Sequence, residues 1–199
     1  MHKLPRSFYT QRTLTVAKEL LGKIFIHKIG RRSISGMIVE TEAYLYNDPA
    51  SHSFRGLTER NRPMFNTGGF LYVYFTYGMH YCANIVTFKE GIGEAVLIRA
   101  VEPINGIGAI ITNRRTDVRH LKGVRHLHSL TNGPAKFAEA FSLTKEHSGI
   151  DLCEDEIFLT KGENVPPSKI VSTTRIGISA AVEKKWRFYI KDSVWVSKK

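Results

Sequence analysis

The chain has few of the features that define several large classes of protein. It contains two cysteines in 199 residues, Cys82 and Cys153, and they form no C-x-x-C pair. A structural zinc or a disulfide framework needs more cysteines than this, so both are expected to be reduced. No stretch approaches the roughly 18 consecutive apolar residues that cross a bilayer, and the first residues lack the apolar run of a secretory signal. We therefore expect a protein that stays inside the cell and does not enter membranes.

Several catalytic signatures are also missing. The sequence has no G-x-x-x-x-G-K-[ST], G-x-G-x-x-G, G-x-S-x-G or H-E-x-x-H. These patterns mark phosphate-binding loops, dinucleotide sites, nucleophile elbows and zinc peptidases. The chain also lacks internal repeats and low-complexity tracts. Its length suits one domain, which we expect to span residues 1–199.

Acidic residues are outnumbered by basic ones. There are 29 Lys and Arg against 18 Asp and Glu, which gives a net charge of +11. A basic protein suits a polyanionic partner, although charge alone does not separate DNA from RNA or anionic lipid, and it can also serve solubility. The run D-P-A-S-H-S-F-R-G-L-T-E-R-N-R-P-M-F groups Arg55, Arg60 and Arg62 in a loop-like context. Basic side chains grouped in this way are expected to contact phosphates.

Two segments have the pattern of short helices. Apolar residues recur at helical spacing over residues 14–21, with Thr13 available as N-cap and Gly22 as terminator. A second helix is expected over residues 134–143, where Asn132 can act as the cap and a proline suits the first turn.

The remaining regular structure is predicted to be strand. The segments rich in β-branched and aromatic residues are 23–29, 35–44, 70–77, 81–88, 95–101, 175–178 and 186–190. Gly-containing turns separate most of them, so we expect one curved, mostly antiparallel sheet with flanking helices, which is an α+β fold. Residues 161–169 have the composition of an exposed connector.

The segment V-E-T-E-A-Y places two carboxylates on one side of a predicted strand. Because side chains alternate along a strand, Glu40, Glu42 and Tyr44 share a face. Two charges on a packed sheet are costly unless partners, water or a ligand satisfy them, so this face is expected to border a cleft. Two alternatives stay open: a solvated strand face with ordinary glutamates, or a Mg²⁺ site in a nuclease, for which no further carboxylate cluster follows.

Tyrosines are concentrated in L-Y-V-Y-F-T-Y-G-M-H-Y-C-A-N. Tyr72 and Tyr74 fall on one strand face, and Tyr77 to His80 are expected to form the turn that follows. Partly exposed tyrosine rings near arginines suit stacking on nucleobases, and an apolar or aromatic tip can wedge into a base stack. The alternative is a packed aromatic strand with an ordinary hairpin turn.

Five segments, taken in order, resemble one known family. They are V-E-T-E-A-Y, A-S-H-S, R-N-R-P-M-F, L-Y-V-Y-x-x-Y-G-M-x-Y-C-x-N and V-L-I-R-A-V-E-P. Their order and spacing resemble the alkyladenine (3-methyladenine) DNA glycosylase family, and with N-G-P-A-K, R-I-G-I and W-R-F-Y-I-K-D-S-V-W-V-S the match covers nearly the whole chain. The resemblance implies a single α+β domain whose curved antiparallel sheet carries a protruding β-hairpin into the minor groove.

The resemblance assigns roles to residues of the two motifs. Glu42 matches the general base that activates the water attacking the sugar C1′. The residues that match the family's base pocket are Tyr44, His52, Tyr74, Asn84 and Arg99. Rings in this set would cover both faces of a flipped base, and the amide would crowd the guanine amino group. The spacing from Tyr44 to His52 is one residue shorter than in the family pattern.

Other matches fall on the expected DNA-binding surface. Tyr77 matches the side chain that intercalates into the gap left by the flipped nucleotide, and Met79 and His80 lie beside it in the hairpin. His80 stands where the family pattern has a tyrosine. The side chains expected to contact the DNA backbone are Arg55, Arg60, Arg62 and Lys136.

The leading hypothesis is therefore a monofunctional DNA glycosylase of base excision repair. It would flip a damaged purine from double-stranded DNA and hydrolyse its N-glycosidic bond as a monomer, without a cofactor or metal, in a bacterial cytoplasm or, in a eukaryote, the nucleus. The alternatives are a non-catalytic RNA- or tRNA-binding module and a metal-dependent nuclease. Glu42 separates the first alternative from the enzyme, because an electrostatic binder gains nothing from a carboxylate inside its nucleic-acid groove.

Overall fold

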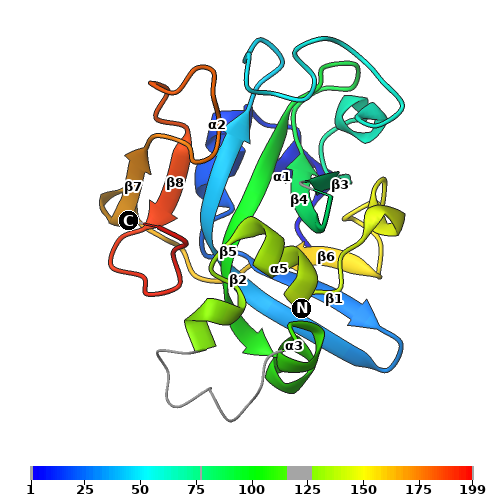
Figure 1. The fold of residues 1–199 in the computed structure, drawn as a ribbon, viewed down its shortest axis with the longest axis vertical. Helices are drawn as coiled ribbons and strands as arrows, with labels where there is room; N and C mark the ends of the chain where they lie inside the picture. Colours follow the sequence, from blue (N-terminus) through cyan, green and yellow to red (C-terminus); the bar gives the residue numbers. More distant parts are fainter. Residues whose placement is uncertain (1, 77, 116–126, 199) are drawn as a thin grey trace.

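A single antiparallel sheet forms the centre of the computed structural model, which describes residues 2–76, 78–115 and 127–198 (Figure 1). The strands are β1 (Ile24–Ile29), β2 (Arg32–Tyr44), β3 (Leu71–Thr76), β4 (His80–Val86), β5 (Ala95–Asn105), β6 (Ile157–Thr160), β7 (Ile170–Thr173) and β8 (Arg187–Ile190). Across the sheet the order is β3-β4-β5-β2-β1-β6, and β8 pairs with both β2 and β7. The α+β class and the curved, mostly antiparallel sheet predicted from the sequence are confirmed.

Strand β2 connects the two halves of the sheet. It is 13 residues long, and one of its edges pairs with β5 along most of its length. The other edge is shared, because β1 pairs with the first half of β2 and β8 pairs with Glu40 to Glu42. On the β5 side the register shifts between Ile38 and Thr41. Such irregularities bend a strand and re-aim its side chains, and this one falls at Glu40, the first glutamate of the V-E-T-E-A-Y motif.

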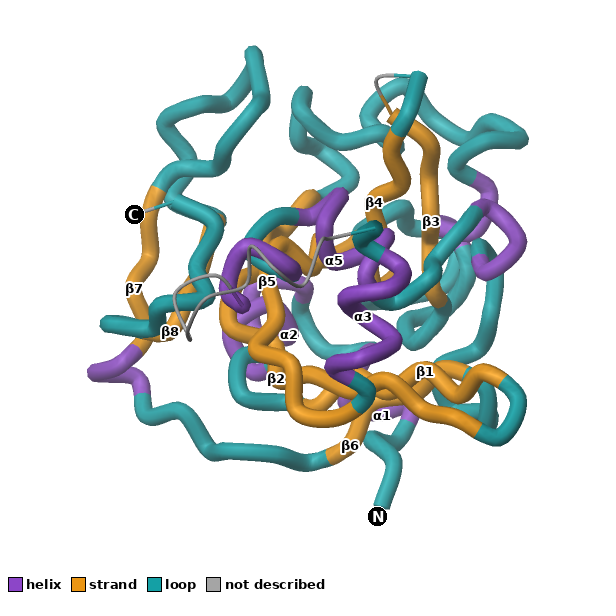
Figure 2. Tube along the Cα trace, turned by 60° about the horizontal axis from the view of Figure 1, so that its bottom comes forward, coloured by secondary structure: helices purple, strands orange, loops and turns teal. Residues whose placement is uncertain are grey.

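The helices of the described residues are short. They are α1 (Arg6–Tyr9), α2 (Thr13–Glu19), α3 (Ile107–Asn113) and α5 (Pro134–Ala140), with 3-10 turns η1 (Arg62–Phe65), η3 (His128–Leu130), η4 (Lys145–His147) and η5 (Pro167–Lys169). None of these helices is long and apolar enough to span a membrane. Helix α5 packs on the sheet beside β4 and β5 (Figure 2). In the core between them, the ring of Phe25 on β1 meets Phe137 and Phe141 edge-on, with ring centroids 5.2 and 5.6 Å apart.

The first predicted helix corresponds to α2, but its predicted cap is wrong. Arg12 occupies the N-cap position, and Thr13 is already helical. The Thr13 hydroxyl lies 2.8 Å from the Thr87 hydroxyl and donates to the buried Glu94 carboxylate. These distant partners replace the local cap. The predicted terminator is confirmed, because Gly22 has φ +83° just after the helix and a Cβ there would collide with a backbone carbonyl.

The second predicted helix corresponds to α5, which ends at Ala140, three residues before the predicted end. Its N-cap is Gly133, so the prediction of Asn132 as the cap is wrong. The side-chain oxygen of Asn132 instead accepts a hydrogen bond from Lys136 Nζ at 2.8 Å. A lysine one turn into the helix therefore uses the group that was expected to cap the backbone.

Six of the seven predicted strands have counterparts, β1 to β5 and β8, and the exposed connector over 161–169 is confirmed apart from its last 3-10 turn. The predicted strand at 175–178 is wrong, since the chain there is irregular. In that segment the Arg175 side chain and the Ile176 N–H are bonded to buried groups of other segments instead of to a neighbouring strand. The strand β7 lies earlier, and β6, α1 and α3 were not predicted.

Candidate active site

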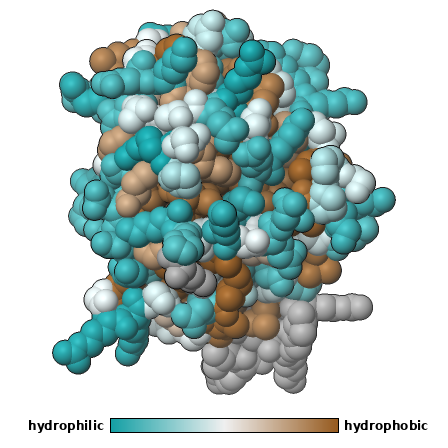
Figure 3. Space-filling view, turned by 180° about the vertical axis from the view of Figure 1, so that it is seen from behind, coloured by the Kyte–Doolittle hydropathy of each residue, from teal (hydrophilic) through white to brown (hydrophobic). Residues whose placement is uncertain are grey.

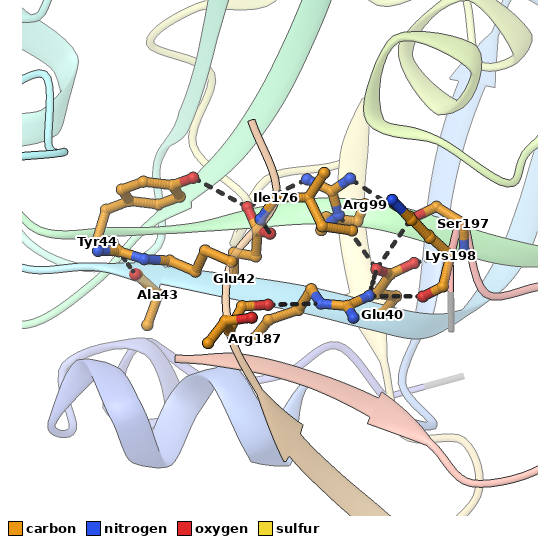
Figure 4. Close-up of polar contacts among 11 residues, drawn as sticks. Glu40, Glu42, Ala43, Tyr44, Arg99, Ile176, Arg187, Ser197 and Lys198 are labelled. Atoms are coloured by element: carbon orange, nitrogen blue, oxygen red, sulfur yellow. Dashed lines mark hydrogen bonds and ion pairs between the residues drawn. The ribbon is translucent and has the colours of Figure 1, made fainter. Parts of the chain in front are cut away.

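Glu42 is fully buried in the middle of the sheet, where β2 lies between β5 and β8, and its carboxylate is surrounded by donors (Figure 4). Oε2 accepts the Tyr44 hydroxyl at 2.9 Å and lies 3.2 Å from Arg99 Nη1. Oε1 accepts the backbone N–H of Ile176 at 2.8 Å. A carboxylate offers about four acceptor sites. The described partners therefore leave one site on Oε1 for a further donor such as a water molecule.

Glu40 is buried on the same side of β2 and is neutralised by two arginines. Its Oε1 accepts from Arg99 Nε at 3.1 Å, from Arg187 Nη1 at 2.8 Å and from Ser197 Oγ at 2.9 Å. Its Oε2 accepts the Ser197 backbone N–H at 2.7 Å. Arg99 thus bridges Glu40 and Glu42, which confirms that the two carboxylates share a face.

The charges in this group balance, because two carboxylates meet two guanidinium groups. A buried pair of carboxylates is tolerated only when it is paired and hydrogen-bonded in this way. The same pairing argues against a magnesium nuclease. Both glutamates already have cationic partners, so they do not present the open acidic face that a divalent ion requires.

Burial and charge fix the protonation of two groups around Glu42. Burial opposes the charge on Arg99, but the Glu42 and Glu40 carboxylates outweigh it and raise the pKa of Arg99 above its usual value. Burial, with the Glu42 carboxylate in addition, raises the pKa of the Tyr44 phenol. Arg99 therefore stays cationic and Tyr44 stays a hydrogen-bond donor at neutral pH.

A cavity of about 340 Å³ opens beside these groups. All five predicted base-pocket residues line it, and they are Tyr44, His52, Tyr74, Asn84 and Arg99. Other lining residues include Tyr72, Met64, Cys82, Pro134, Ile176 and Ile178. Glu42 is not part of the lining, but three of its partners are, so its carboxylate lies directly behind the wall. A cavity of this size that is lined by aromatic rings and a few polar groups is the usual form of a ligand site.

Rings dominate one side of the cavity. Tyr72 and Tyr74 lie with their centroids 5.6 Å apart and their planes inclined by 28°, and the His52 ring meets Tyr74 edge-on at 4.4 Å. His52 Nδ1 lies 3.0 Å from the Tyr72 hydroxyl. Burial, assisted by the nearby Arg60 charge, lowers the pKa of His52, and burial raises the pKa of Tyr72 to about 12. At neutral pH the His52 and Tyr72 rings are therefore uncharged.

The amide predicted to face guanine lies on the strand next to the tyrosines. Asn84 of β4 is almost completely buried, and its Nδ2 donates to the Tyr72 carbonyl at 3.2 Å. This bond fixes the orientation of the amide. The Asn84 carbonyl oxygen is then free of that bond and can accept from a ligand in the cavity.

The β3–β4 hairpin carries exposed apolar side chains at its end. Met79 is 69% exposed and Phe75, which the sequence analysis did not single out, is 47% exposed. His80 is exposed beside them at the start of β4. The predicted intercalating residue, Tyr77, lies outside the described residues. That this hairpin enters DNA stays a prediction.

The four residues predicted to contact the DNA backbone do not have equivalent surroundings. Arg55 is exposed, whereas the exposed Arg62 pairs with a neighbouring glutamate. Lys136 is half-buried on α5 and bonded to Asn132. Arg60 reaches the pocket wall, because its Nη2 donates to the Phe75 carbonyl at 3.0 Å and its guanidinium lies 5.6 Å from the Tyr74 ring centroid.

The sequence analysis missed a buried ion pair behind the pocket. Both terminal nitrogens of the Arg175 guanidinium pair with the Asp48 carboxylate, and neither side chain is exposed. Arg175 also donates to the Ala43 carbonyl at 3.0 Å and lies 4.7 Å from the centroid of the Tyr44 ring. The two partners are 127 residues apart in the sequence, so no local pattern could have indicated the pair.

Among the described residues, one group of side chains has metal-ligand proximity. His27, His147 and Glu156 lie together, and none of them lines the cavity. His147 Nδ1 accepts the Thr144 backbone N–H at 3.0 Å, which places the proton of a neutral ring on Nε2. Nε2 lies 4.0 Å from Glu156 Oε1, which is an ion-pair distance and too long for a hydrogen bond.

Comparison with known proteins agrees with this geometry. The family model described as methylpurine-DNA glycosylase matches residues 7–194. A protein of Chlorobium phaeobacteroides named as a 3-methyladenine DNA glycosylase is 46% identical, with 100% of this chain and 97% of that protein covered. Similarly named proteins of Carboxydothermus hydrogenoformans and Methanoculleus marisnigri are 47% and 44% identical, each with 98% of this chain and 99% of the relative covered.

The fold, the cavity and these matches define an enzyme class, the hydrolases that act on N-glycosyl bonds, with DNA as the substrate. The chain belongs to the methylpurine-DNA glycosylase family. The resemblance inferred from the five motifs is therefore confirmed.

Proposed function

We propose that the protein flips alkylated or otherwise damaged purines of the 3-methyladenine class out of duplex DNA and hydrolyses their N-glycosidic bonds with Glu42-activated water, as the first step of base excision repair. The observation that carries the proposal is the Glu42 carboxylate behind an aromatic cavity, with one acceptor site left among its described partners. The relatives named as 3-methyladenine DNA glycosylases support the same lesion class. We further propose that the enzyme acts as a monomer.

The cavity would hold the base and its walls would supply recognition. Stacking of a flipped base on an aromatic ring is worth about 1–3 kcal/mol per base. A purine alkylated at N3 or N7 is cationic, so the neutral faces of Tyr44 and Tyr74 would attract it through cation–π interaction. Neutral His52 and the Asn84 amide can offer hydrogen bonds without repelling this cation.

The chemical step would need little more than a positioned water. A cationic purine is already a good leaving group, so the enzyme must mainly orient the water and stabilise an oxocarbenium-like sugar. Glu42 would accept the water's proton and its charge would offset the developing cation. Flipping costs a few kcal/mol and least for a poorly paired base, so selectivity would arise in both the flip and the pocket.

The direct test is incubation with duplexes that each bear one candidate lesion, scoring base release under single-turnover conditions. Lesions to compare are 3-methyladenine, 7-methylguanine, hypoxanthine and ethenoadenine, with an unmodified duplex as reference. The assay in EDTA should give full activity. Loss of activity in EDTA together with strand cleavage would favour a nuclease, and binding without base release would favour a nucleic-acid-binding module.

Glu42→Gln should separate recognition from chemistry. Glutamine keeps the shape of glutamate but cannot accept a proton, so excision should fall by about 10² or more while lesion binding is retained. Glu102→Gln, on β5 and outside the cavity lining, is the matched control and should stay active. Near-normal excision by Glu42→Gln would refute its role as the base. A covalent adduct trapped by borohydride would replace water attack with Schiff-base chemistry.

A further inference from the structure

Ser197 is bonded to the buried carboxylate of Glu40, which is also bonded to Arg99 of the pocket. Ser197 donates its backbone N–H and its hydroxyl to Glu40, at 2.7 and 2.9 Å. The next carbonyl, that of Lys198, accepts from Arg187 Nη1 at 2.8 Å. Figure 4 shows Ser197 and Lys198 on one side of Glu40 and Arg99 on the other.

Glu40 and Glu42 compete for one guanidinium. Arg99 gives its Nε to Glu40 at 3.1 Å and its Nη1 to Glu42 at 3.2 Å. Its third nitrogen, Nη2, lies 3.4 Å from Ser197 Oγ. The three guanidinium nitrogens of Arg99 thus contact Glu40, Glu42 and Ser197. Rotation of the guanidinium would break at least one of these contacts.

We propose that Ser197, acting through Glu40, positions Arg99 and thereby fixes the orientation in which Arg99 holds the catalytic carboxylate of Glu42. This inference rests on the proposed function, in which Glu42 is the base. Ser197 and Arg187 bond to the Glu40 carboxylate, which in turn holds the Nε edge of Arg99. The opposite edge of Arg99 is then presented to Glu42 in a single orientation.

The contacts of Ser197 and Glu40 predict how their removal changes the excision rate. Removing the Ser197 hydroxyl takes one donor from Glu40 and one acceptor from Arg99, and the orientation of Arg99 is less constrained. Arg99 can then turn away from the position in which its Nη1 meets Glu42, so the carboxylate is held less precisely for proton transfer. Glu40→Gln removes the charge that holds Arg99 Nε and should loosen Arg99 further.

The first experiment compares three serine variants in single-turnover excision. Ser197→Ala should lower the excision rate by roughly three- to tenfold, the usual net effect of one intramolecular hydrogen bond, with unchanged lesion binding. Ser197→Thr retains the hydroxyl and should restore most of the rate. Ser193→Ala is the matched control, because Ser193 lies in the same terminal segment and bonds to the Trp195 N–H at 3.3 Å instead of to Glu40.

The second experiment compares excision and lesion binding in Glu40→Gln. The single-turnover rate constant should fall at least as far as in Ser197→Ala while the affinity for a lesion-bearing duplex is unchanged, because Arg99 loses the charged partner of its Nε. A merely structural role would lower the active fraction, and therefore the amplitudes of binding and excision, without changing the rate constant. If Glu40→Gln does not fold, the Ser197 series decides the matter.

The outcomes separate this inference from the proposed function. A parent protein that releases no damaged base overturns both. An active parent whose rate is the same in Ser197→Ala overturns the inference alone, as does an equal loss in Ser197→Ala and Ser193→Ala. A loss of the rate constant that is restricted to Ser197→Ala and rescued by threonine, together with a loss of the rate constant at unchanged binding in Glu40→Gln, supports it.

Discussion

The Asp48–Arg175 pair holds the back of the pocket through one ring. Arg175 is bonded to Asp48 and to the Ala43 carbonyl, and its guanidinium packs against Tyr44. Tyr44 in turn donates to Glu42. A buried ion pair contributes little net stability compared with apolar packing, whereas the loss of one partner leaves an uncompensated charge. The pair is therefore better explained by the orientation it gives to Tyr44 than by the stability of the fold.

Asp48→Ala should destabilise the protein by about 3–5 kcal/mol, because Arg175 would remain buried without its counter-charge. Urea unfolding measures this loss. Asp155→Ala is the matched control, since Asp155 is 80% exposed and pairs with Lys3 at the surface, and it should change stability little. The double variant Asp48→Ala with Arg175→Met should recover part of the loss. An Asp48→Ala midpoint equal to that of the control would contradict the account.

At the scale of elements, the β3–β4 hairpin combines a rigid base with an exposed apolar end. Tyr72 and Tyr74 are paired with Asn84 and Cys82 across the two strands, and all four line the cavity. The same two strands carry Phe75 and the turn residue Met79 outward into solvent. One hairpin therefore links the pocket to the surface beside it, which suits a wedge that fills the gap left by a flipped base.

Met79→Ala should leave the free energy of unfolding within about 0.5 kcal/mol of the parent, as expected for an exposed side chain. It should weaken binding to a lesion-bearing duplex by roughly fivefold, about 1 kcal/mol. Ile29→Ala is the matched control, because Ile29 is 41% exposed and pairs with the end of β2 remote from Tyr44. Equal affinities of the two variants, measured by fluorescence anisotropy, would show that the hairpin end does not contact DNA.

Local pattern was enough to predict the elements that carry the site. The β-branched and aromatic runs indicated β1 to β5, and strand alternation placed Glu42 and Tyr44 together. The errors occur where distant partners decide. Thr13 bonds to residues 74 and 81 positions away instead of capping α2. The segment with Arg175 and Ile176 is bonded to Asp48 and Glu42 instead of to a neighbouring strand. Such pairs leave no periodic trace in the sequence.

Two groups of the candidate site were beyond sequence reasoning for the same reason. The Ile176 backbone N–H carries no side-chain signature, yet it holds Glu42 Oε1. Ser197 lies 157 residues from Glu40. The motifs identified the carboxylates and the rings, whereas the donors that orient them come from the last quarter of the chain.

At the scale of the whole molecule, the face seen from behind is mostly hydrophilic, with apolar residues interspersed (Figure 3). Several of the 29 Lys and Arg are neutralised in the interior, among them Arg99, Arg175 and Arg187. The excess charge of +11 therefore belongs largely to exposed side chains that can meet phosphates.

Binding of undamaged duplex should weaken steeply with salt. Each phosphate neutralised contributes about −0.9 to the slope of log affinity against log salt, and we expect an overall slope of roughly −3 to −6. A titration between low and physiological salt measures it. Arg55→Ala, at an exposed loop position, should make the slope shallower by about one phosphate. A slope near zero would mean that phosphate contacts do not dominate binding.

The bonds of Ser197 to Glu40 have a consequence for the order in which the protein folds. Glu40 is 147 residues from Arg187 and 157 residues from Ser197 in the sequence. Contacts between such distant segments require the closure of a long loop, so they form slowly. We therefore expect the segment from β8 to Ser197 to dock on β2 late in folding, and the buried Glu40 carboxylate to be fully compensated only at that step.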